Sequence, residues 1–192
     1  MATRSAVILA EKITPLPGGD PVVEEPRYRF RGRAVYGHWD GYPSWTGRIL
    51  SLAYTDRKRA EALLAHGDFS ILGPFLDPKE LEAFGVRGRH TFDQPLPGVS
   101  VFYRRDREER GREAREVRLE GQGSLLRLLG EKYRKAWDAE FTYLGVPEGE
   151  VVRWYGYGAL EGKTYRLFEL YPPRADWPQV ALEEFVKERE AE

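Results

Sequence analysis

The pattern that most constrains the fold is an amphipathic helix signature followed by three strand-like runs. Apolar side chains recur at helical spacing over residues 124–137, ending at Trp137. Next come "EFTYLGV", "VVRWYGYG" and "TYRLFELY", which are rich in β-branched and aromatic residues and are separated by the turn sequences "PEGE" and "LEGK". Short turns join antiparallel strands, so this half of the chain predicts a meander of three strands beside a helix.

The first half of the chain adds strands and short helices in mixed order. Strands are expected over "AVILA", "RYRFRGRAVY" and "GVSVFYRRDR", the last with "REVRLE" as its hairpin partner. Short helices are expected over "SWTGRILSLAY", "DRKRAEALLAHG" and "DPKELEAFG", and the Pro- and Gly-rich stretch at 13–26 predicts a loop. Together these elements predict an α+β fold, in which a mostly antiparallel sheet carries helices packed on one face.

The chain has a suitable length for a single domain that ends in a C-terminal helix. We expect residues 1–157 to form an α+β domain with a loop insertion at 11–26, and residues 158–192 to add a strand and a helix packed on the same domain. No segment resembles a signal peptide or a membrane span, so we expect a cytoplasmic protein with no membrane partner. Asn is absent and charged residues are abundant, which is typical of thermophilic proteins.

The composition excludes several kinds of chemistry. The sequence has no Cys, which rules out disulfides, thiolate zinc sites and a Cys nucleophile. Three scattered His residues make a poor metal signature, so we expect neither a bound metal nor a cofactor. A net charge of -1 argues against a protein dominated by non-specific nucleic-acid binding, although it leaves room for a local basic face.

Several phrases of the sequence carry a family resemblance. They are 1–5 (MATRS), 36–43 (YGHWDGYP), 47–54 (GRILSLAY), 67–73 (GDFSILG), 90–93 (HTFD) and 103–109 (YRRDREE). In order and spacing they resemble an uncharacterised family of phage, prophage and bacterial proteins with the motifs M-[AS]-T-R-S, Y-C-H-W-D-G-Y-P, H-x-F-D and Y-G-R-D-R-G-E. The resemblance implies a phage context and brings no established activity with it. Gly37 stands where the family has Cys, and Arg104 and Glu108 replace family glycines.

The phrase "HWDGYP" gathers His38, Trp39, Asp40 and Tyr42 where a strand gives way to a helix. We expect its Gly and Pro to set a rigid corner. Residues two apart in an extended segment share a face, so His38 and Asp40 could bind a metal or act as general acid and base. The alternative is that Asp40 caps the following turn while His38 pairs with a buried backbone group. The two aromatic residues suit a base- or sugar-binding pocket or, alternatively, core packing.

A second polar cluster is the turn "RRDRE", which we expect to share one pocket with the start of the first strand. Asp106 can hold Arg105 and Arg107 through bidentate pairs, and a fixed guanidinium suits phosphate or carboxylate recognition. Arg4 and Ser5 directly precede an apolar strand and would line the same pocket. The alternative is a solvated hairpin turn, whose surface ion pairs contribute little.

Four arginines alternate along the second strand and project from one face. They are Arg27, Arg29, Arg31 and Arg33. They could meet nucleic acid, with Tyr28 or Tyr36 nearby for stacking on bases. The alternative, which we favour, is an edge strand that charge protects from aggregation, because Glu24 and Glu25 offset the patch.

Fixed arginines and aromatics without a convincing catalytic set favour a non-enzymatic, phage-type accessory protein. It would bind an anionic or nucleotide-like ligand, or a host protein. The expected binding residues are Arg4, Ser5, His38, Trp39, Asp40, Tyr42, Arg105, Asp106 and Arg107. One alternative is a small hydrolase or nuclease, in which His38 and Asp40 act with His90 and Asp93. Another is a protein-interaction module that uses the arginine stripe or the C-terminal helix.

Overall fold

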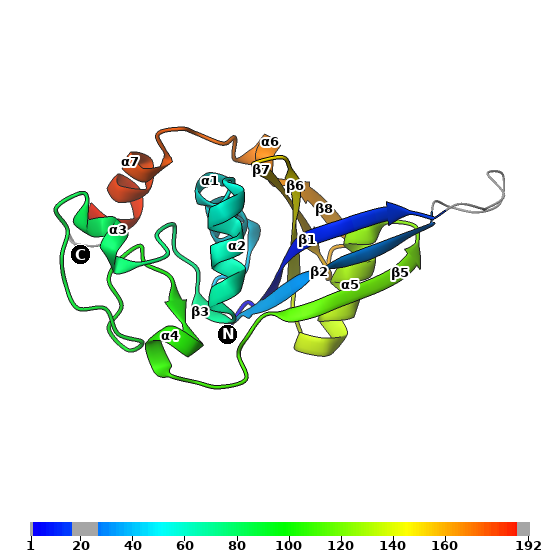
Figure 1. Cartoon of the computed structure of the whole chain (residues 1–192), viewed down its shortest axis with the longest axis horizontal. Coiled ribbons are helices and arrows are strands. Elements are labelled where there is room, and N and C mark those ends of the chain that lie inside the picture. The colour runs from blue at the N-terminus through cyan, green and yellow to red at the C-terminus, as the bar shows by residue number, and fades with distance from the viewer. Residues whose placement is uncertain (1, 17–26, 188–192) are drawn as a thin grey trace.

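The computed structural model describes residues 2–16 and 27–187, and within them eight strands form one mixed sheet (Figure 1). The strands are β1 (Ser5–Pro15), β2 (Arg27–Gly37), β3 (Phe69–Ile71), β4 (Val101–Phe102), β5 (Arg115–Gln122), β6 (Phe141–Glu148), β7 (Val151–Gly158) and β8 (Lys163–Arg166). Their order is β4-β3-β2-β1-β6-β7-β8, and β5 lies beside β2. The β1–β6 and β2–β3 pairs are parallel and the other pairs antiparallel, which confirms the predicted α+β class with a mostly antiparallel sheet.

The helices are short, with one exception. They are α1 (Arg48–Ala53), α2 (Arg57–His66), α3 (Pro78–Glu82), α4 (Tyr103–Arg107), α5 (Leu125–Trp137), α6 (Leu167–Leu170) and α7 (Trp177–Ala181), with the π-helical η1 (Pro43–Gly47) and η2 (Leu182–Lys187). The side chains of Asp56, Asp77 and Ser124 accept backbone N–H groups at the starts of α2, α3 and α5. The helices expected at these three places are therefore confirmed.

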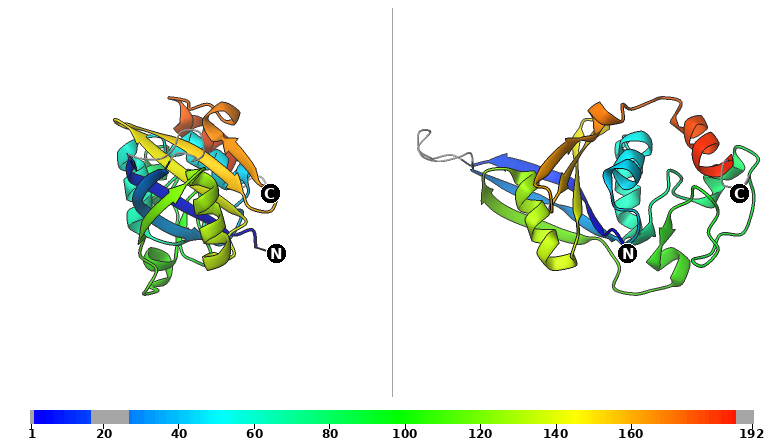
Figure 2. Two further views of the ribbon diagram at one scale, coloured as in Figure 1. Left: turned by 90° about the vertical axis from the view of Figure 1, so that its right-hand side faces the viewer. Right: turned by 180° about the vertical axis from the view of Figure 1, so that it is seen from behind.

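Helices pack on both faces of the sheet, and the expectation of one covered face is corrected. Alternate residues of a strand point to opposite sides, and Ser5–Ala10 of β1 is buried throughout. Ala6 and Ile8 contribute to a core with α5, whereas Val7 and Leu9 contribute to a second core with α1 and α2. Figure 2 shows the sheet between these two groups of helices. An uninterrupted apolar run such as "AVILA" requires cover on both sides.

Beyond the two cores, β1, β2 and β5 continue together as a three-stranded arm, which is the right-hand part of Figure 1. One face of the arm packs on α5, because Phe30 of β2 and Val117 of β5 are buried against Leu126 and Leu129 of that helix. The opposite face of the arm carries the alternating arginines of β2, which are exposed. The sheet is therefore apolar on one side of the arm and charged on the other.

The predicted loop at 11–26 is wrong for its first part. β1 runs through Pro15, which pairs with Tyr28 of β2 after a bulge in the strand. Backbone hydrogen bonds to β2 extend β1 beyond its buried residues. Pro15 is tolerated because it lies at the end of the strand. Residues 17–26 lie outside the described part of the chain.

The predicted hairpin after residue 98 is also wrong. β4 is two residues long, and Tyr103–Arg107 forms helix α4 in place of a charged strand end. β5 pairs with β2 along eight residues, and β4 pairs with β3. The reason is burial, since Val117 and Leu119 of β5 find apolar cover only against α5.

The segment after residue 157 packs on the same domain. β8 continues the meander beside β7, although "TYRLFELY" is strand only to Arg166. The C-terminal helical segment then returns to η1 and α1, where the Phe185 ring meets Trp45 of η1 edge-on at 5.3 Å and Glu184 pairs with Arg48 of α1. The apolar side of this segment is thus part of the core, and residues 188–192 lie outside the described part. Within the described ranges, every helix is too short or too polar to span a bilayer.

Gly37 ends β2 at a point where β1 and β3 both contact it. An added Cβ would lie 2.4 Å from the Phe69 ring and 2.7 Å from the Ser5 hydroxyl oxygen. We expect Gly37→Ala to lower the free energy of unfolding by about 1–3 kcal/mol, the usual cost of overpacking, as measured by urea denaturation.

The matched control is Gly121→Ala in β5. Its added carbon would meet only the flexible end of the Leu128 side chain, at 2.7 Å. We expect this variant to lose clearly less stability than Gly37→Ala. Equal losses in the two variants would contradict the packing described for the β1–β2–β3 junction.

Candidate functional site

The corner predicted from "HWDGYP" is present and is held by the backbone. Asp40 has φ 53°, and its carbonyl accepts hydrogen bonds from the backbone N–H and the hydroxyl of Thr46. The Gly41 N–H donates to the Thr3 carbonyl, and an added Cβ at Gly41 would lie 2.6 Å from that oxygen. The buried Tyr143 hydroxyl donates to the Gly41 carbonyl. The chain therefore passes from β2 into η1 along a single defined path.

The side chains of the corner point in different directions. The Asp40 carboxylate accepts from the Tyr42 hydroxyl at 3.2 Å, and both groups are at the surface. His38 contacts Tyr36 instead, and the Trp39 ring packs edge-on against it at 4.8 Å while remaining 45% exposed. His38 and Asp40 therefore do not form an acid–base pair.

Asp68 is the central residue of the site and is completely buried. It follows α2 directly, in the phrase "GDFSILG". Its carboxylate accepts the Tyr36 N–H at 2.8 Å, both ends of the Arg115 guanidinium, and the Arg112 guanidinium at 3.3 Å. A buried carboxylate requires such partners, because burial without them would cost several kcal/mol.

The backbone of Asp68 joins the same segments. Its N–H donates to the Arg112 carbonyl at 2.8 Å, and its carbonyl accepts the Tyr103 N–H at 3.2 Å. Gly67 allows this approach, since it has φ 81° and an added Cβ would lie 2.2 Å from the Arg112 carbonyl oxygen. Asp68 thereby connects the end of β2, the start of α4 and the approach to β5.

A pocket of about 610 Å³ opens beside these groups. Its lining consists of Arg4, Tyr36, His38, Asp68, Tyr103, Arg107, Glu109, Arg112, Arg115 and Trp137. Four guanidinium groups face two carboxylates, one of which is the buried Asp68. We refer to this site as the Asp68 pocket. It brings together three predicted binding residues, Arg4, His38 and Arg107.

The cations of the Asp68 pocket are held against aromatic rings. The Arg112 guanidinium lies 4.1 Å from the Tyr103 ring centre, and Arg115 lies 5.1 Å from that of Trp137. Arg112 also donates to Glu109 at 3.0 Å. Each of these two guanidinium groups is thus fixed by a carboxylate and by a ring, which is the arrangement that presents cationic N–H groups in a defined orientation.

His38 is the histidine of the Asp68 pocket. Burial lowers its pKa, and the nearby Arg4 and Arg112 lower it further, so the imidazole is neutral at pH 7. Burial raises the pKa of the Tyr36 phenol, whose oxygen lies 2.7 Å from His38 Nδ1. In the tautomer in which Nδ1 accepts a hydrogen bond from the Tyr36 hydroxyl, Nε2 carries the imidazole hydrogen and is a hydrogen-bond donor.

Arg105, Asp106 and His90 form a separate cluster that stabilises the fold. Asp106 accepts from Arg105 Nε at 2.9 Å and from the Phe102 N–H at 2.8 Å, and His90 Nε2 lies 3.3 Å from its carboxylate. His90 Nδ1 accepts the Leu96 N–H at 3.0 Å. The side chains of Asp106 and His90 are only 6% and 3% exposed, so their polar atoms are used internally.

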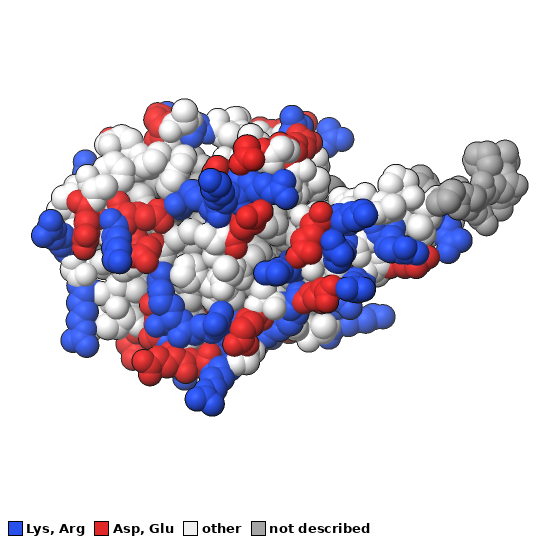
Figure 3. Space-filling model, viewed as in Figure 1, with Lys and Arg blue, Asp and Glu red and all other residues white. Residues whose placement is uncertain are grey.

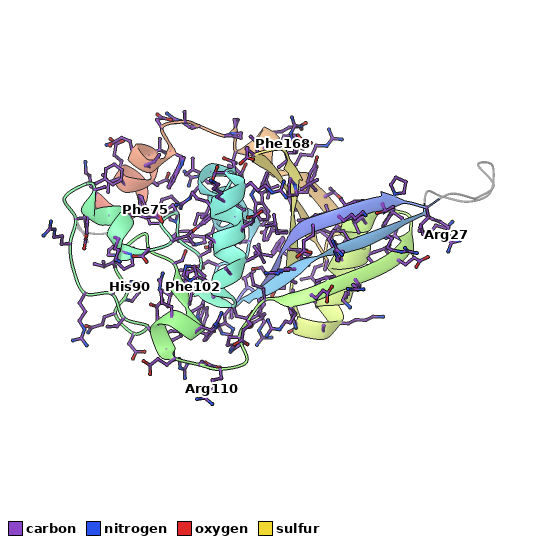
Figure 4. All side chains as sticks on the ribbon, in the orientation of Figure 1. Arg27, Phe75, His90, Phe102, Arg110 and Phe168 are labelled. Atoms are coloured by element: carbon purple, nitrogen blue, oxygen red, sulfur yellow. The ribbon has the colours of Figure 1, made fainter. Side chains whose placement is uncertain are left out.

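The remaining predicted residues also lie apart from the Asp68 pocket. Asp93 is exposed in a bend, and Ser5 is buried with a hydroxyl that has no hydrogen-bond partner among the described residues. Figure 4 shows His90 in the half of the molecule that lies away from the arm. The four catalytic candidates His38, Asp40, His90 and Asp93 therefore do not converge.

Sequence reasoning missed the residues that organise the pocket. Asp68 has a recognisable signal, because it is a single acid at the head of the apolar run "FSIL" and had to be either paired or exposed. Arg112 and Arg115 have none, since they lie among many charged residues of both signs. Trp137 was assigned only to the apolar stripe of α5, and its place at the end of that helix brings it into the pocket lining.

Comparisons of the chain with protein-family models, with curated proteins and with solved structures find no match. Among the described residues, no three His, Asp or Glu side chains lie close enough together to hold a metal ion. The site therefore combines cationic and aromatic side chains with two carboxylates and with a His38 that is neutral at pH 7.

Replacing Asp106 with Asn tests its structural role. Burial alone would raise the pKa of Asp106, but hydrogen bonds from His90, Arg105 and the Phe102 N–H outweigh burial and hold the pKa well below its ordinary value. We expect Asp106→Asn to lower the free energy of unfolding at pH 7 by about 2–3 kcal/mol in urea denaturation.

The sign of the pH dependence follows from the lowered pKa. The wild-type advantage over Asp106→Asn is complete above about pH 4, the ordinary range of a carboxyl, and is lost progressively as pH falls below that value. Asp176→Asn is the control, because Asp176 is exposed and paired only with Arg174, and its effect should stay within about 0.5 kcal/mol. An advantage that persists unchanged at low pH would contradict the assignment.

Proposed function

We propose that the protein is a non-enzymatic, phage-type binding protein whose Asp68 pocket captures a small anionic ligand with nucleotide-like character. The observation that carries the proposal is the gathering of Arg4, Arg107, Arg112 and Arg115 around one pocket that also contains aromatic rings. The family resemblance supports the phage context. The pocket volume of about 610 Å³ favours a small molecule over the surface of a host protein.

Charge and geometry support an anion as the ligand. Asp68 engages both ends of Arg115 but only one nitrogen of Arg112, which has further N–H groups to offer. Arg107 is 58% exposed and contacts Glu109 at 3.9 Å and the Phe92 ring at 5.0 Å, so most of its guanidinium surface is open to a ligand. Guanidinium groups that keep N–H donors available can bind phosphate and carboxylate oxygens. The Nε2–H of a neutral His38 would add an uncharged donor.

The aromatic residues support a ring in the ligand. Trp137 meets Tyr36 edge-on at 6.0 Å, and both rings belong to the pocket lining. Bases stack on such faces with little dependence on their identity. A phosphate near Arg4 and Arg107 with a base near Trp137 would use both kinds of group.

The same geometry argues against hydrolysis. An acid–base mechanism needs two titratable groups within reach of one reacting bond, and His38 is the only His in the lining. The carboxylates there, Asp68 and Glu109, are both engaged by Arg112. The pocket thus offers more groups that hold an anion than groups that transfer a proton.

Thermal shift and calorimetric titration test the proposal. The ligands are inorganic phosphate and nucleoside mono-, di- and triphosphates, preceded by a native mass spectrum of the purified protein. We expect at least one nucleotide to stabilise the wild type, and Arg107→Ala to weaken its binding by about tenfold or more, the effect of losing one charged contact.

Arg127→Ala is the matched control for this titration. Arg127 is 62% exposed on α5 and pairs with Glu131 of the same helix, so its loss should leave the affinity unchanged. If no nucleotide or phosphate stabilises the wild type, or if the two variants behave alike, the proposal fails.

The pH dependence of binding gives an independent prediction. The free pocket lowers the pKa of His38, whereas a bound anion offsets the charge of Arg4 and Arg112 and raises that pKa again. Binding is therefore coupled to proton uptake, and affinity should increase as pH falls through the range around and below about 6.5, the ordinary pKa of His. The phosphate of the ligand also titrates at about pH 6, so the two proteins must be compared with each other. Calorimetry at several pH values should show a larger gain in affinity on acidification for the wild type than for His38→Gln. A wild-type profile parallel to that of the variant would contradict the role of His38.

A further inference from the structure

The exposed face of the three-stranded arm carries an excess of basic side chains. β2 lies between β1 and β5, and residues paired across the three strands share this face. Its members are Lys12, Thr14, Arg27, Arg29, Arg31, Arg33, Glu116, Arg118, Glu120 and Gln122, with Glu11 at the bulge. We call this surface the arm face. Figure 3 shows Lys and Arg side chains along the arm, with acidic side chains between them.

Cations outnumber acids on the arm face by six to three, on this membership. Arg31 is flanked directly by Lys12 on β1 and by Arg118 on β5, so three cations form one row across the strands. Like charges in directly opposite positions destabilise a sheet. The acids offset this repulsion in part. Glu11 pairs with Arg31 at 3.4 Å and with Arg33 at 3.1 Å, Glu120 pairs with Arg29 at 3.8 Å, and Glu116 pairs with Arg118 at 2.8 Å, so six cations share three carboxylates.

Protection of a sheet edge does not account for this charge. β2 is an interior strand with hydrogen-bonded neighbours on both sides, so the favoured interpretation of its arginines as an edge guard is wrong. The side chains of Arg29, Arg31 and Arg118 remain 64%, 48% and 73% exposed. A central row of cations that destabilises the sheet and faces water is instead typical of a surface that meets a polyanion.

We propose that the arm face binds the phosphate backbone of double-stranded DNA. The four arginines of β2 recur at every second residue, so they are spaced by about 6.8 Å and span about 20 Å of strand. A DNA duplex carries about one negative charge per 1.7 Å of its axis, so a row of this length faces several phosphates. A groove of about 690 Å³ along the arm is lined by Arg29, Arg31, Arg118 and Lys12, among others.

The composition of the arm face favours duplex DNA as the partner over a protein, a single strand or duplex RNA. Protein interfaces depend on aromatic and apolar anchors, whereas the exposed side chains of the arm face are charged or polar, and Leu9, which pairs with Arg33, is buried. Single strands are bound by stacking on rings, but Tyr28 and Tyr36 belong to the opposite face, where the Tyr28 hydroxyl donates to the Gly123 carbonyl and Tyr36 contacts Trp137. Duplex RNA is recognised largely through its 2′-hydroxyls, for which the face offers few neutral polar groups.

Fluorescence anisotropy with a labelled DNA duplex of arbitrary sequence tests the proposal. The full chain is titrated at a series of salt concentrations. We expect binding at low salt, with a logarithmic salt slope of about -3 to -5, corresponding to four or five phosphate contacts. Replacing Arg29, Arg31 and Arg118 together with Gln should weaken binding by about tenfold or more and make the slope less steep by about two to three.

Two matched triple variants complete the experiment. Replacing the same three residues with Lys keeps the charge and should retain the wild-type salt slope. Replacing Arg87, Arg89 and Arg127 with Gln removes equal charge from exposed positions away from the arm face and should leave binding unchanged. Melting curves confirm that all variants fold. The proposal is overturned if wild type does not bind at low salt, if both Gln variants lose binding equally, or if single-stranded DNA, duplex RNA or polyglutamate binds more tightly than the duplex.

Discussion

The part of the structure that contains the Asp68 pocket depends on one interaction, the pairing of the buried Asp68 carboxylate with Arg112 and Arg115. A fully buried carboxylate is costly unless it is neutralised and hydrogen-bonded, and Asp68 receives Arg112, Arg115 and the Tyr36 N–H. These partners come from separate parts of the chain. The Asp68 side chain therefore joins the end of β2 to the approach to β5, and its backbone carbonyl, which accepts the Tyr103 N–H, joins both to α4. The Asp68 pocket is the space that remains beside this junction.

Strand β5 connects the two anion-binding surfaces that we propose. It begins at Arg115, which belongs to the Asp68 pocket and faces α5, and it continues into the arm with Arg118 on the opposite side. A strand presents alternate residues to opposite faces, so one short segment serves both surfaces without conflict. Its apolar residue Val117 attaches it to the core under α5. The two arginines of this strand thus differ in their surroundings, because Arg115 is held by Asp68 and Arg118 faces water.

Local patterns were sufficient for much of the fold but not for its long-range pairing. Helical spacing predicted α5, capping residues such as Asp56 marked helix starts, and alternation predicted β2 with its arginines on one face. The partner of β5 could not be predicted, because the choice between β2 and β4 depends on which surface buries Val117. Only part of the site could be predicted, for a similar reason. Its charged residues were visible in the sequence, whereas their grouping depends on contacts between distant segments, as with Asp106, which pairs with His90.

A double-mutant cycle between Asp68 and Arg115 tests the central claim most directly. The free energies of unfolding are measured for the wild type, Asp68→Asn, Arg115→Gln and the double variant. If the buried pair organises this junction, the two single effects should overlap, with a coupling energy of about 1.5 kcal/mol or more. Effects that add to within about 0.5 kcal/mol would show that the two side chains act independently, and the account of the pocket would be contradicted.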